Sequence, residues 1–546
     1  MPTLNWIGKE AVVEHHRHVP TRLLECDREL SVGDPEAENL LIEGDNLEAL
    51  KALLPRYRGQ VKCIYIDPPY NTGNESWVYN DNVNDPRIRK WLGDVVGKEA
   101  EDLCRHDKWL CMMYPRLALL REFLREDGAI FVSIADHEVH NLRHILDEIF
   151  GPQNFIATII WQKKQSPQND AINLSDMHDY IVVYAKRAKL SRDDSNGWDR
   201  SLLPREAAQN SRYSNSDNDP RGPWTSADYT CNKTADERPN LFYAITNPHT
   251  GEQVWPSRRR VWAFDEAAHS RNAADNRVSW GNGTRTRPRV KKFLSEVAEG
   301  VVPTTWWTRE FAGDNQEARR ELRDWISDDR LDFSTPKPIR LIQRILQIAT
   351  DKDSLVMDSF AGSGSTGHAV LDLNKADGGC RRFVLVELDN AICGDVTAQR
   401  LKVVITGRNE VNPLGSGFRY CRLGRTLLDA DGNVNGEVPF ADLARYVYLL
   451  ATGVPAPKQP RKDCPLLGVH NGQAIYLLYN GVLGDRRPAG GNVLTGAVLA
   501  HLPPHPAGRG PRVVYGEACR LGEATLRRED VTFRQIPYSL RGADQP

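Results

Sequence analysis

Short apolar runs alternate with segments of helical periodicity in two stretches of the chain. In the first stretch, strands are predicted over 39–42, 61–66, 129–134, 155–161 and 180–184, and helices open at Asp45 and cover about 115–126 and 138–150. In the second, a helix over 339–349 precedes a strand over 354–357, a helix over about 366–373, a strand over 382–386 and a helix ending near 405. This alternation predicts an α/β fold with a doubly wound, mainly parallel sheet covered on both faces.

The two stretches are separated by a segment in which this pattern is lost. From about 190 to 330, polar residues and tryptophans crowd together without a regular period. Beyond the second stretch, apolar runs at 474–479 and 512–515 predict strands of a small further module. We therefore expect five regions: an N-terminal arm over 1–36, the first half of the α/β domain over 37–190, an inserted domain over 191–332, the second half over 333–410, and a C-terminal accessory α/β module over 411–546.

Composition is typical of a soluble globular protein, with 40% hydrophobic and 26% charged residues. No apolar run is long enough to span a membrane, and the N-terminal residues lack the apolar core of a signal peptide. The ten cysteines stand singly without a CxxC pair, which argues against a disulfide framework and a zinc ribbon. A reducing compartment, a cytoplasmic location and no membrane partner are the resulting expectations. The net charge of −2 does not indicate a nucleic-acid role, which must be sought in local charge.

The sharpest motif is Asp67-Pro68-Pro69-Tyr70, which ends the predicted strand over 61–66. The exocyclic amine of adenine is a poor nucleophile, because its lone pair is delocalised into the ring. The Asp67 carboxylate and the Pro68 carbonyl would place two acceptors against the amine hydrogens, and Tyr70 would stack on an extruded base. Ligands of open α/β sheets bind at the carboxyl ends of strands, which favours this function over an ordinary turn.

A second candidate site is the turn Asp358-Ser-Phe360-Ala-Gly362-Ser-Gly364-Ser-Thr366. Its glycines would let the backbone approach a ligand closely, with a helix N-terminus behind them. The turn lacks the lysine of a phosphate-binding loop, so a nucleoside triphosphate fits poorly. Glu387 ends the next predicted strand about twenty residues later, a spacing that suits an acid bonded to ribose hydroxyls. A tight turn without a ligand is the plainer alternative.

Together these segments resemble the β-class, or circularly permuted, DNA amino-methyltransferases, and more closely the modification subunits of type III restriction–modification systems. The likeness lies in Gly44-Asp45, Ile66-Asp-Pro-Pro-Tyr-Asn-Thr-Gly73, His178-Asp-Tyr-Ile-Val-Val-Tyr184, Thr335-Pro-Lys-Pro338 and Phe360-Ala-Gly-Ser-Gly364, and it is weak beyond residue 410. Ser359 and Ser365 stand where the family usually has proline and threonine. The resemblance implies a class I methyltransferase fold, S-adenosylmethionine as cofactor, and methylation of adenine N6 in duplex DNA.

By the same likeness, the first half of the domain is catalytic and the second binds the cofactor. It implies catalytic roles for Asp67, Pro68, Pro69 and Tyr70. It also implies a cofactor site lined by Asp45, Thr335, Lys337, Pro338, Asp358, Phe360, Gly362, Gly364, Thr366 and Glu387, with Phe360 against the methionine end. Methyl transfer would be direct and in line, with no covalent intermediate.

The inserted domain is the candidate target-recognition domain. Its residues 255–292 carry ten Lys or Arg against three acids, with Trp255, Trp262, Phe264 and Trp280 interleaved. Because arginine binds phosphates and pairs with guanine, we expect DNA contacts from Arg258, Arg259, Arg260, Arg285, Arg287 and Arg289. A solvated basic face is the alternative.

Other functions find less support in the sequence. His137, His140 and His144 share a helical face, but the motif is one residue short of HExxH and no metal site is expected. Neither a GxxxxGK[ST] loop nor a convincing nuclease motif appears, so a restriction or phage-defence system would need a helicase or nuclease partner subunit for cleavage. A homodimer is a further candidate assembly. Cytosine-N4 methylation and a role as a DNA-binding assembly subunit remain open alternatives.

Overall fold

The computed structural model describes residues 3–34, 38–72, 90, 93–96, 104–167, 172–191, 193–205, 210–281, 287–297, 300–326, 333, 335–407, 412–429, 431–461, 463–479, 491–537 and 540. The chain forms two compact units. Unit 1 consists of Met1–Ser201 and Thr304–Pro546, and unit 2 consists of Leu202–Pro303. A segment in the middle of the sequence therefore folds as a body of its own.

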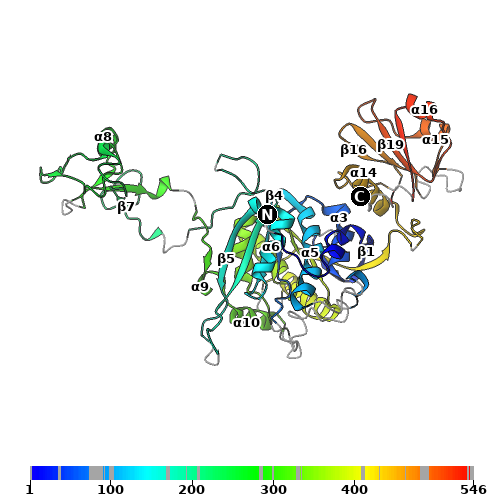
Figure 1. Ribbon diagram of the computed structural model, residues 1–546, viewed down its shortest axis with the longest axis horizontal. Helices are drawn as coiled ribbons and strands as arrows, with labels where there is room; N and C mark the ends of the chain where they lie inside the picture. Colours follow the sequence, from blue (N-terminus) through cyan, green and yellow to red (C-terminus); the bar gives the residue numbers. More distant parts are fainter. Residues whose placement is uncertain are drawn as a thin grey trace. The chain divides into compact units, whose positions relative to one another are not determined.

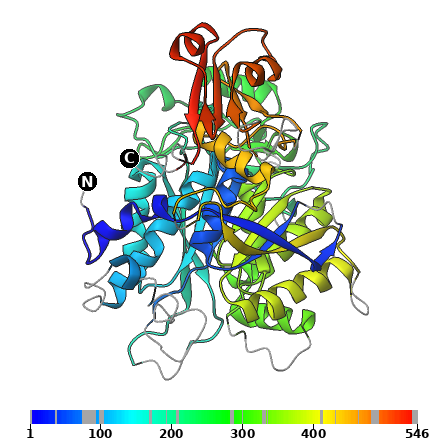
Figure 2. The same ribbon diagram turned by 90° about the vertical axis from the view of Figure 1, so that its right-hand side faces the viewer.

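A ten-stranded sheet is the centre of unit 1 (Figures 1 and 2). The strands lie in the order β1 (Arg22–Gly33), β15 (Gly417–Thr426), β2 (Leu40–Glu43), β14 (Arg382–Glu387), β13 (Leu355–Asp358), β3 (Val61–Ile66), β4 (Leu124–Ile134), β6 (His178–Ala185), β5 (Phe155–Gln162) and β12 (Trp306–Trp307). All neighbours from β15 to β4 are parallel, whereas β1 and β6 run antiparallel to their neighbours. This confirms the predicted mainly parallel α/β sheet.

Helices cover both faces of this sheet. Helices α3 (Asn46–Tyr57), α5 (Arg105–Phe123) and α6 (Val139–Phe150) share one apolar core with Ile64 and Ile66 of β3. Cys63 and Tyr65, which alternate with them, are also buried but belong to the opposite face. That face is covered by α11 (Ile339–Ala349) and α12 (Ser365–Asp377), with α13 (Gln399–Thr406) packed beside them. The sheet is therefore doubly wound, as predicted.

The N-terminal residues expected to form an arm pack on the sheet instead. Helices α1 (Lys9–Val13) and α2 (His15–His18) contact α5, and β1 pairs with β15 along the sheet edge. At a register shift in this pairing, the Ser31 hydroxyl accepts from the Tyr420 backbone N–H at 3.1 Å. The sequence pattern missed this strand, because its residues alternate irregularly between half-buried and exposed positions.

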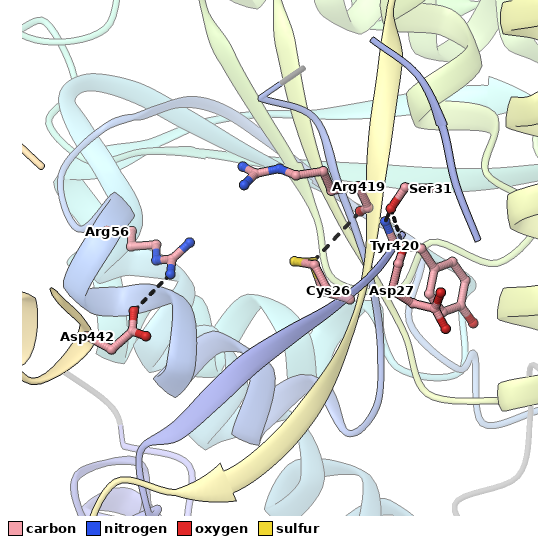
Figure 3. Close-up of a disulfide and its surroundings, with 8 residues drawn as sticks. Cys26, Asp27, Ser31, Arg56, Arg419, Tyr420 and Asp442 are labelled. Atoms are coloured by element: carbon pink, nitrogen blue, oxygen red, sulfur yellow. Dashed lines mark hydrogen bonds and ion pairs between the residues drawn. A yellow bond between two sulfur atoms is a disulfide. The ribbon is translucent and has the colours of Figure 1, made fainter. Parts of the chain in front are cut away.

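A disulfide joins the edge strand β1 to its neighbour β15 (Figure 3). Cys26 of β1 lies opposite Cys421 of β15, and the two are disulfide-bonded. The sequence favoured unpaired cysteines, because neither residue has a cysteine nearby in the chain. The structure corrects this for one pair. These two cysteines are 395 residues apart in the sequence, and the pairing of β1 with β15 brings them together.

Residues beyond β15 form a module with a core of its own. Helix α14 (Phe440–Thr452) packs on a four-stranded sheet with the order β16 (Leu466–His470), β17 (Gln473–Leu477), β19 (Arg512–Gly516) and β21 (Val531–Gln535). Its smaller elements are β18 (Val493–Leu494), α15 (Gly496–His501), β20 (Ala518–Cys519) and α16 (Glu523–Arg528). Both strands predicted here are present. No helix within the described ranges is long and apolar enough to span a membrane.

Unit 2 contains a small sheet with the order β10 (Val278–Ser279), β11 (Arg289–Phe293) and β7 (Trp224–Asp228). The other elements are η3 (Pro239–Leu241), β8 (Ile245–Thr246), β9 (Gln253–Val254), α8 (Glu266–Ala274) and η4 (Leu294–Glu296). Its core is aromatic and includes Tyr229, Trp262 and Trp280. The unit is narrower than the predicted domain over 191–332, because β12, α9 (Arg309–Ala312) and α10 (Asn315–Trp325) belong to unit 1.

Candidate active site

The strands β14, β13 and β3 are neighbours and run parallel, so their carboxyl ends meet at one edge of the sheet. Asp67 directly follows β3, Asp358 ends β13 and Glu387 ends β14. The two halves of the chain thus bring their predicted acids to the same edge, although the whole of unit 2 lies between them in the sequence.

The two carboxylate oxygens of Asp67 have different surroundings. Oδ2 accepts from Lys337 Nζ at 2.5 Å. Oδ1 is buried, and no described residue donates to it at hydrogen-bond geometry, although the Tyr70 hydroxyl lies near enough to interact with this carboxylate. In the same turn, Trp109 Nε1 donates to the Pro69 carbonyl at 2.7 Å and fixes its orientation. Asp67 therefore keeps one buried acceptor to which the described part of the chain donates no hydrogen bond of proper geometry.

Tyr70 presents a neutral ring beside this carboxylate. Burial raises the pKa of the Tyr70 hydroxyl well above its usual value, and the Asp67 charge raises it further. The hydroxyl is therefore protonated at neutral pH. The ammonium of Lys337 lies 5.0 Å from the centre of the Tyr70 ring, so a single lysine contacts both ends of the motif.

The residue after the motif is held by a buried acid that the sequence did not reveal. Asn71 has a φ of 55°, a left-handed conformation that asparagine tolerates. Its side-chain amide donates to Glu138, which is fully buried and also bonds His106 Nδ1 at 2.6 Å and Asn141 Nδ2 at 2.8 Å. Glu138 lies in the histidine-rich segment for which no metal site was expected. Within the described ranges, no group of three or more His, Cys, Asp or Glu is arranged to hold a metal ion.

The predicted glycine loop joins β13 to α12. Gly362 and Gly364 have φ values of 52° and 75°, in the left-handed region that favours glycine. A Cβ at Gly364 would lie 3.0 Å from Thr397 Cγ2, so the loop is closely packed there. The Thr397 hydroxyl also donates to the Gly362 carbonyl at 2.6 Å. This loop therefore needs glycine for both conformation and space.

The acids beside this loop are bonded to it. Asp358 accepts from the Thr366 hydroxyl at 2.6 Å and from the Phe360 backbone N–H at 3.0 Å. Burial raises the pKa of Asp358 to about 7 against the effect of these hydrogen bonds, and the Asp67 and Glu387 charges raise it as well. Glu387 accepts from the Gly362 N–H at 2.8 Å and from the Asp389 N–H at 2.9 Å. In this structure, Glu387 holds the glycine loop.

A buried arginine behind the loop was also missed from the sequence. Arg400 donates to the Ser363 hydroxyl at 3.1 Å, to the Ser365 hydroxyl at 2.9 Å and to His368 Nδ1 at 3.2 Å. Burial lowers the pKa of Arg400 to about 10, so it stays charged at neutral pH. Only the three-dimensional packing of α13 on α12 reveals this support.

Most of the remaining predicted cofactor residues lie at the same place. Thr335, Lys337 and Phe360 line a small cavity of about 20 Å³ together with Asp67 and Asp358. Pro338 caps α11 next to it. Asp45 lies outside that lining; it caps α3 and pairs with Arg116 at 3.0 Å. The neighbouring Asn46 nevertheless donates to the Ser359 carbonyl at 3.0 Å, which ties the start of α3 to the loop.

The predicted DNA-binding arginines of unit 2 differ in their surroundings. Arg260 and Arg289 pair with Asp228 at 3.3 and 2.7 Å. Arg258, Arg259 and Arg287 are exposed, and no acid of the described part of unit 2 pairs with them; the Arg258 guanidinium lies over the Phe242 ring at 5.5 Å. Arg285 lies outside the described residues.

Comparison with known proteins identifies the family of this chain. The family model for DNA methylases matches residues 61–398, which include Asp67, the glycine loop and Glu387. This match covers more than half of the chain. The chain belongs to the DNA methylase family. Within that family, its doubly wound sheet is the class I methyltransferase fold expected from the sequence.

Three relatives with curated names show how far the likeness extends. The type III restriction-modification enzyme StyLTI Mod subunit of Salmonella typhimurium is 33% identical over 80% of this chain and 65% of its own length. The EcoPI Mod subunit of Escherichia phage P1 is 31% identical over 71% and 64%. The type II methyltransferase M.KpnI of Klebsiella pneumoniae is 30% identical over 67% and 84%. This methylase thus spans slightly less than two thirds of the length of these two type III relatives.

Proposed function

We propose that this chain transfers a methyl group from S-adenosylmethionine to the N6 amine of an extruded adenine in duplex DNA. Its family membership supports methylation of DNA. The observation that carries the proposal is the buried Oδ1 of Asp67, to which no described residue donates at hydrogen-bond geometry, close to Tyr70 and to the glycine loop. A base amine would supply the missing donor.

The residues at this edge fit a cationic cofactor. S-adenosylmethionine carries a sulfonium and an ammonium group, and it supplies the activated methyl group when bound. Asp358 and Glu387 place two buried carboxyl groups beside the loop, whereas the Asp67 carboxylate is paired with Lys337. Gly362 and Gly364 let the backbone come close to a ligand. Phe360 and Thr335 line the cavity beside them.

The chain's own groups account for the chemistry. Asp67 Oδ1 accepts an amine hydrogen, so the nitrogen lone pair becomes available, and Tyr70 holds the base plane. The lone pair forms the new N–C bond while the electrons of the broken C–S bond stay on sulfur. One amine proton then leaves through Oδ1 toward solvent. Positioning and electrostatics supply the acceleration.

The alternative target is cytosine N4, whose amine needs the same acceptor. The resemblance favours adenine, because the motif begins with Asp67 rather than serine. The names of the type III relatives support a place in a restriction-modification system, as the modification subunit beside a cleaving partner. The homodimer remains a prediction.

The experiment compares wild type with Asp67→Asn on unmethylated DNA. We expect N6-methyladenine in nucleoside digests of the wild-type reaction, and a rate lower by roughly 10²–10³ in the variant with unchanged cofactor affinity. Asp353→Ala, which changes an exposed acid in the turn before β13, serves as the control. N4-methylcytosine in the digest would establish the alternative, and normal turnover by Asp67→Asn would refute the assigned role.

A further inference from the structure

The ion pair between Asp67 and Lys337 joins the two halves of the domain at the candidate site. Lys337 Nζ lies 2.5 Å from Asp67 Oδ2, and the side chains are only 9% and 15% exposed. A buried ion pair costs desolvation, and replacing one with apolar residues is often neutral or stabilising. A contribution to stability therefore does not explain why this ion pair is present. Its position at the candidate site points to a role in function.

The pair leaves the carboxylate asymmetric. Oδ2 accepts from the ammonium, whereas Oδ1 is buried and no described residue donates to it at hydrogen-bond geometry, the Tyr70 hydroxyl being a nearby group. A carboxylate free to rotate would offer either oxygen. Because Lys337 holds Oδ2, the other oxygen has a fixed direction.

Lys337 is itself held in place at its backbone. Its carbonyl accepts from the Ser365 hydroxyl at 2.7 Å, and Arg400 donates to that hydroxyl at 2.9 Å. Pro338, with φ fixed by its ring, follows it directly as the N-cap residue of α11. The ammonium also lies 5.0 Å from the centre of the Tyr70 ring. The lysine thus links the glycine loop to the carboxylate and to the stacking ring.

We propose that Lys337 is a positioning residue for methyl transfer: it holds Asp67 Oδ2 so that Oδ1 faces the target amine. This rests on the proposed function and differs from the role implied by the family resemblance, in which Lys337 only lines the cofactor site. A residue that acts through Asp67 changes the rate of transfer without changing the affinity for the cofactor.

The test is a double-mutant cycle with Lys337→Met and Asp67→Asn in the full chain, with Lys337→Arg as the conservative variant. Single-turnover methylation and the Kd values for S-adenosylmethionine and DNA are measured for each protein. We expect Lys337→Met to slow transfer by about tenfold to a hundredfold with both Kd values unchanged. Lys337→Arg should recover part of the rate, because a guanidinium also pairs with a carboxylate. In the Asp67→Asn background, Lys337→Met should add little further loss.

Several outcomes would overturn this role. A raised Kd for S-adenosylmethionine with normal transfer at saturation would make Lys337 a cofactor ligand. An equal loss in both backgrounds would make its effect independent of Asp67. Lys375→Met, on the exposed side of α12, controls for loss of a lysine, and Lys337→Gln replaces the methionine variant if thermal unfolding shows that the latter is not folded. If wild type itself fails to methylate DNA, the proposed function fails first and this role with it.

Discussion

The carboxyl groups at the sheet edge are the most informative residues of this protein. Burial raises the pKa of Asp358 to about 7, with Asp67 and Glu387 close enough to raise it as well. A carboxyl group in this condition is half protonated at neutral pH when no cation is bound. A cationic ligand stabilises the ionised form, so ligand binding and proton release are linked.

This linkage gives a pH dependence with a defined sign. Below pH 7 the binding of S-adenosylmethionine must displace a proton from Asp358, whereas above pH 7 the proton is already absent. The Kd should therefore fall by roughly eightfold from pH 6 to pH 7.5, as expected for one group of pKa about 7. Titration calorimetry in buffers of different ionisation enthalpy measures both the Kd and the protons released. Asp358→Asn should bind more weakly, with a flat profile; a flat profile in wild type would contradict the linkage.

Apart from the family resemblance, the sequence pattern indicated site residues only where each follows a strand. Asp67 and Glu387 end apolar runs, and parallel strands bring such ends to one edge. The partners of these residues could not be found in that way. Lys337 reaches Asp67 from a segment beyond unit 2, and Arg400 supports the glycine loop from a helix with no motif of its own. Such contacts depend on the order of strands and on helix packing, which a single sequence does not contain.

At the scale of elements, the sequence predicted best where local signals and burial agree. The helix expected from Asp45 begins at Asn46, and the Asp45 carboxylate accepts from the Leu47 and Glu48 N–H groups as a cap. The strand over 61–66 has the predicted bounds. Helix α5 was expected to cover about residues 115–126. It begins at Arg105 instead, because the buried residues before Pro115 pack on the core as part of the same helix.

The basic segment of unit 2 shows why a local charge count is not enough. Arg289 donates to Asp228 at 2.7 Å and to Ser226 through two further nitrogens, so it ties β11 to β7. Arg277 bonds both Asp275 and Glu296. These arginines hold unit 2 together. The exposed arginines for which the described part of unit 2 offers no acid partner are better placed to bind phosphate.

We therefore expect the two kinds of arginine to behave differently on substitution. Changing Arg258, Arg259 and Arg287 to alanine should flatten the salt dependence of DNA binding, by about 0.9 in the slope of log affinity against log salt for each phosphate that is no longer neutralised. Arg289→Ala should leave the salt dependence of DNA binding nearly unchanged. It should instead lower the free energy of unfolding of unit 2 by about 1 kcal/mol. Filter binding across a salt series and thermal unfolding distinguish the two effects. An unchanged slope in the triple variant would mean that another surface of unit 2 meets the duplex.

The division of the whole molecule into units was foreseen only approximately. Loss of helical and strand periodicity near residue 190 marks the end of β6, not the start of unit 2. Ala188 and Trp198 form a bridge that stays with unit 1, and Ser201 N donates to Ile348 O at 2.9 Å. At the other end, β12 joins the central sheet. Irregular segments that pack on a domain cannot be told from an insertion by their composition.

The two ends of unit 2 lie next to each other in space, so the unit can be removed from the chain by a short replacement. Leu203 and Val301 form an antiparallel bridge in which each N–H donates to the other's carbonyl, at 2.9 and 2.8 Å. A two-residue turn closes a pair of this kind. Replacing residues 204–300 with Asn-Gly should therefore remove unit 2 without straining the chain on either side.

We expect the shortened protein to keep its cofactor affinity and to lose specific DNA binding. The acids and the glycine loop all lie in unit 1, so the Kd for S-adenosylmethionine should stay within about twofold of wild type, well inside the tenfold that removal of one charged hydrogen bond would cost. Specific DNA affinity should fall to the non-specific level, a loss on the order of a thousandfold or more. Calorimetry and competition binding with target and random duplexes measure the two quantities. If target discrimination survives the excision, recognition must lie in unit 1, where the C-terminal module is the region without another assigned role.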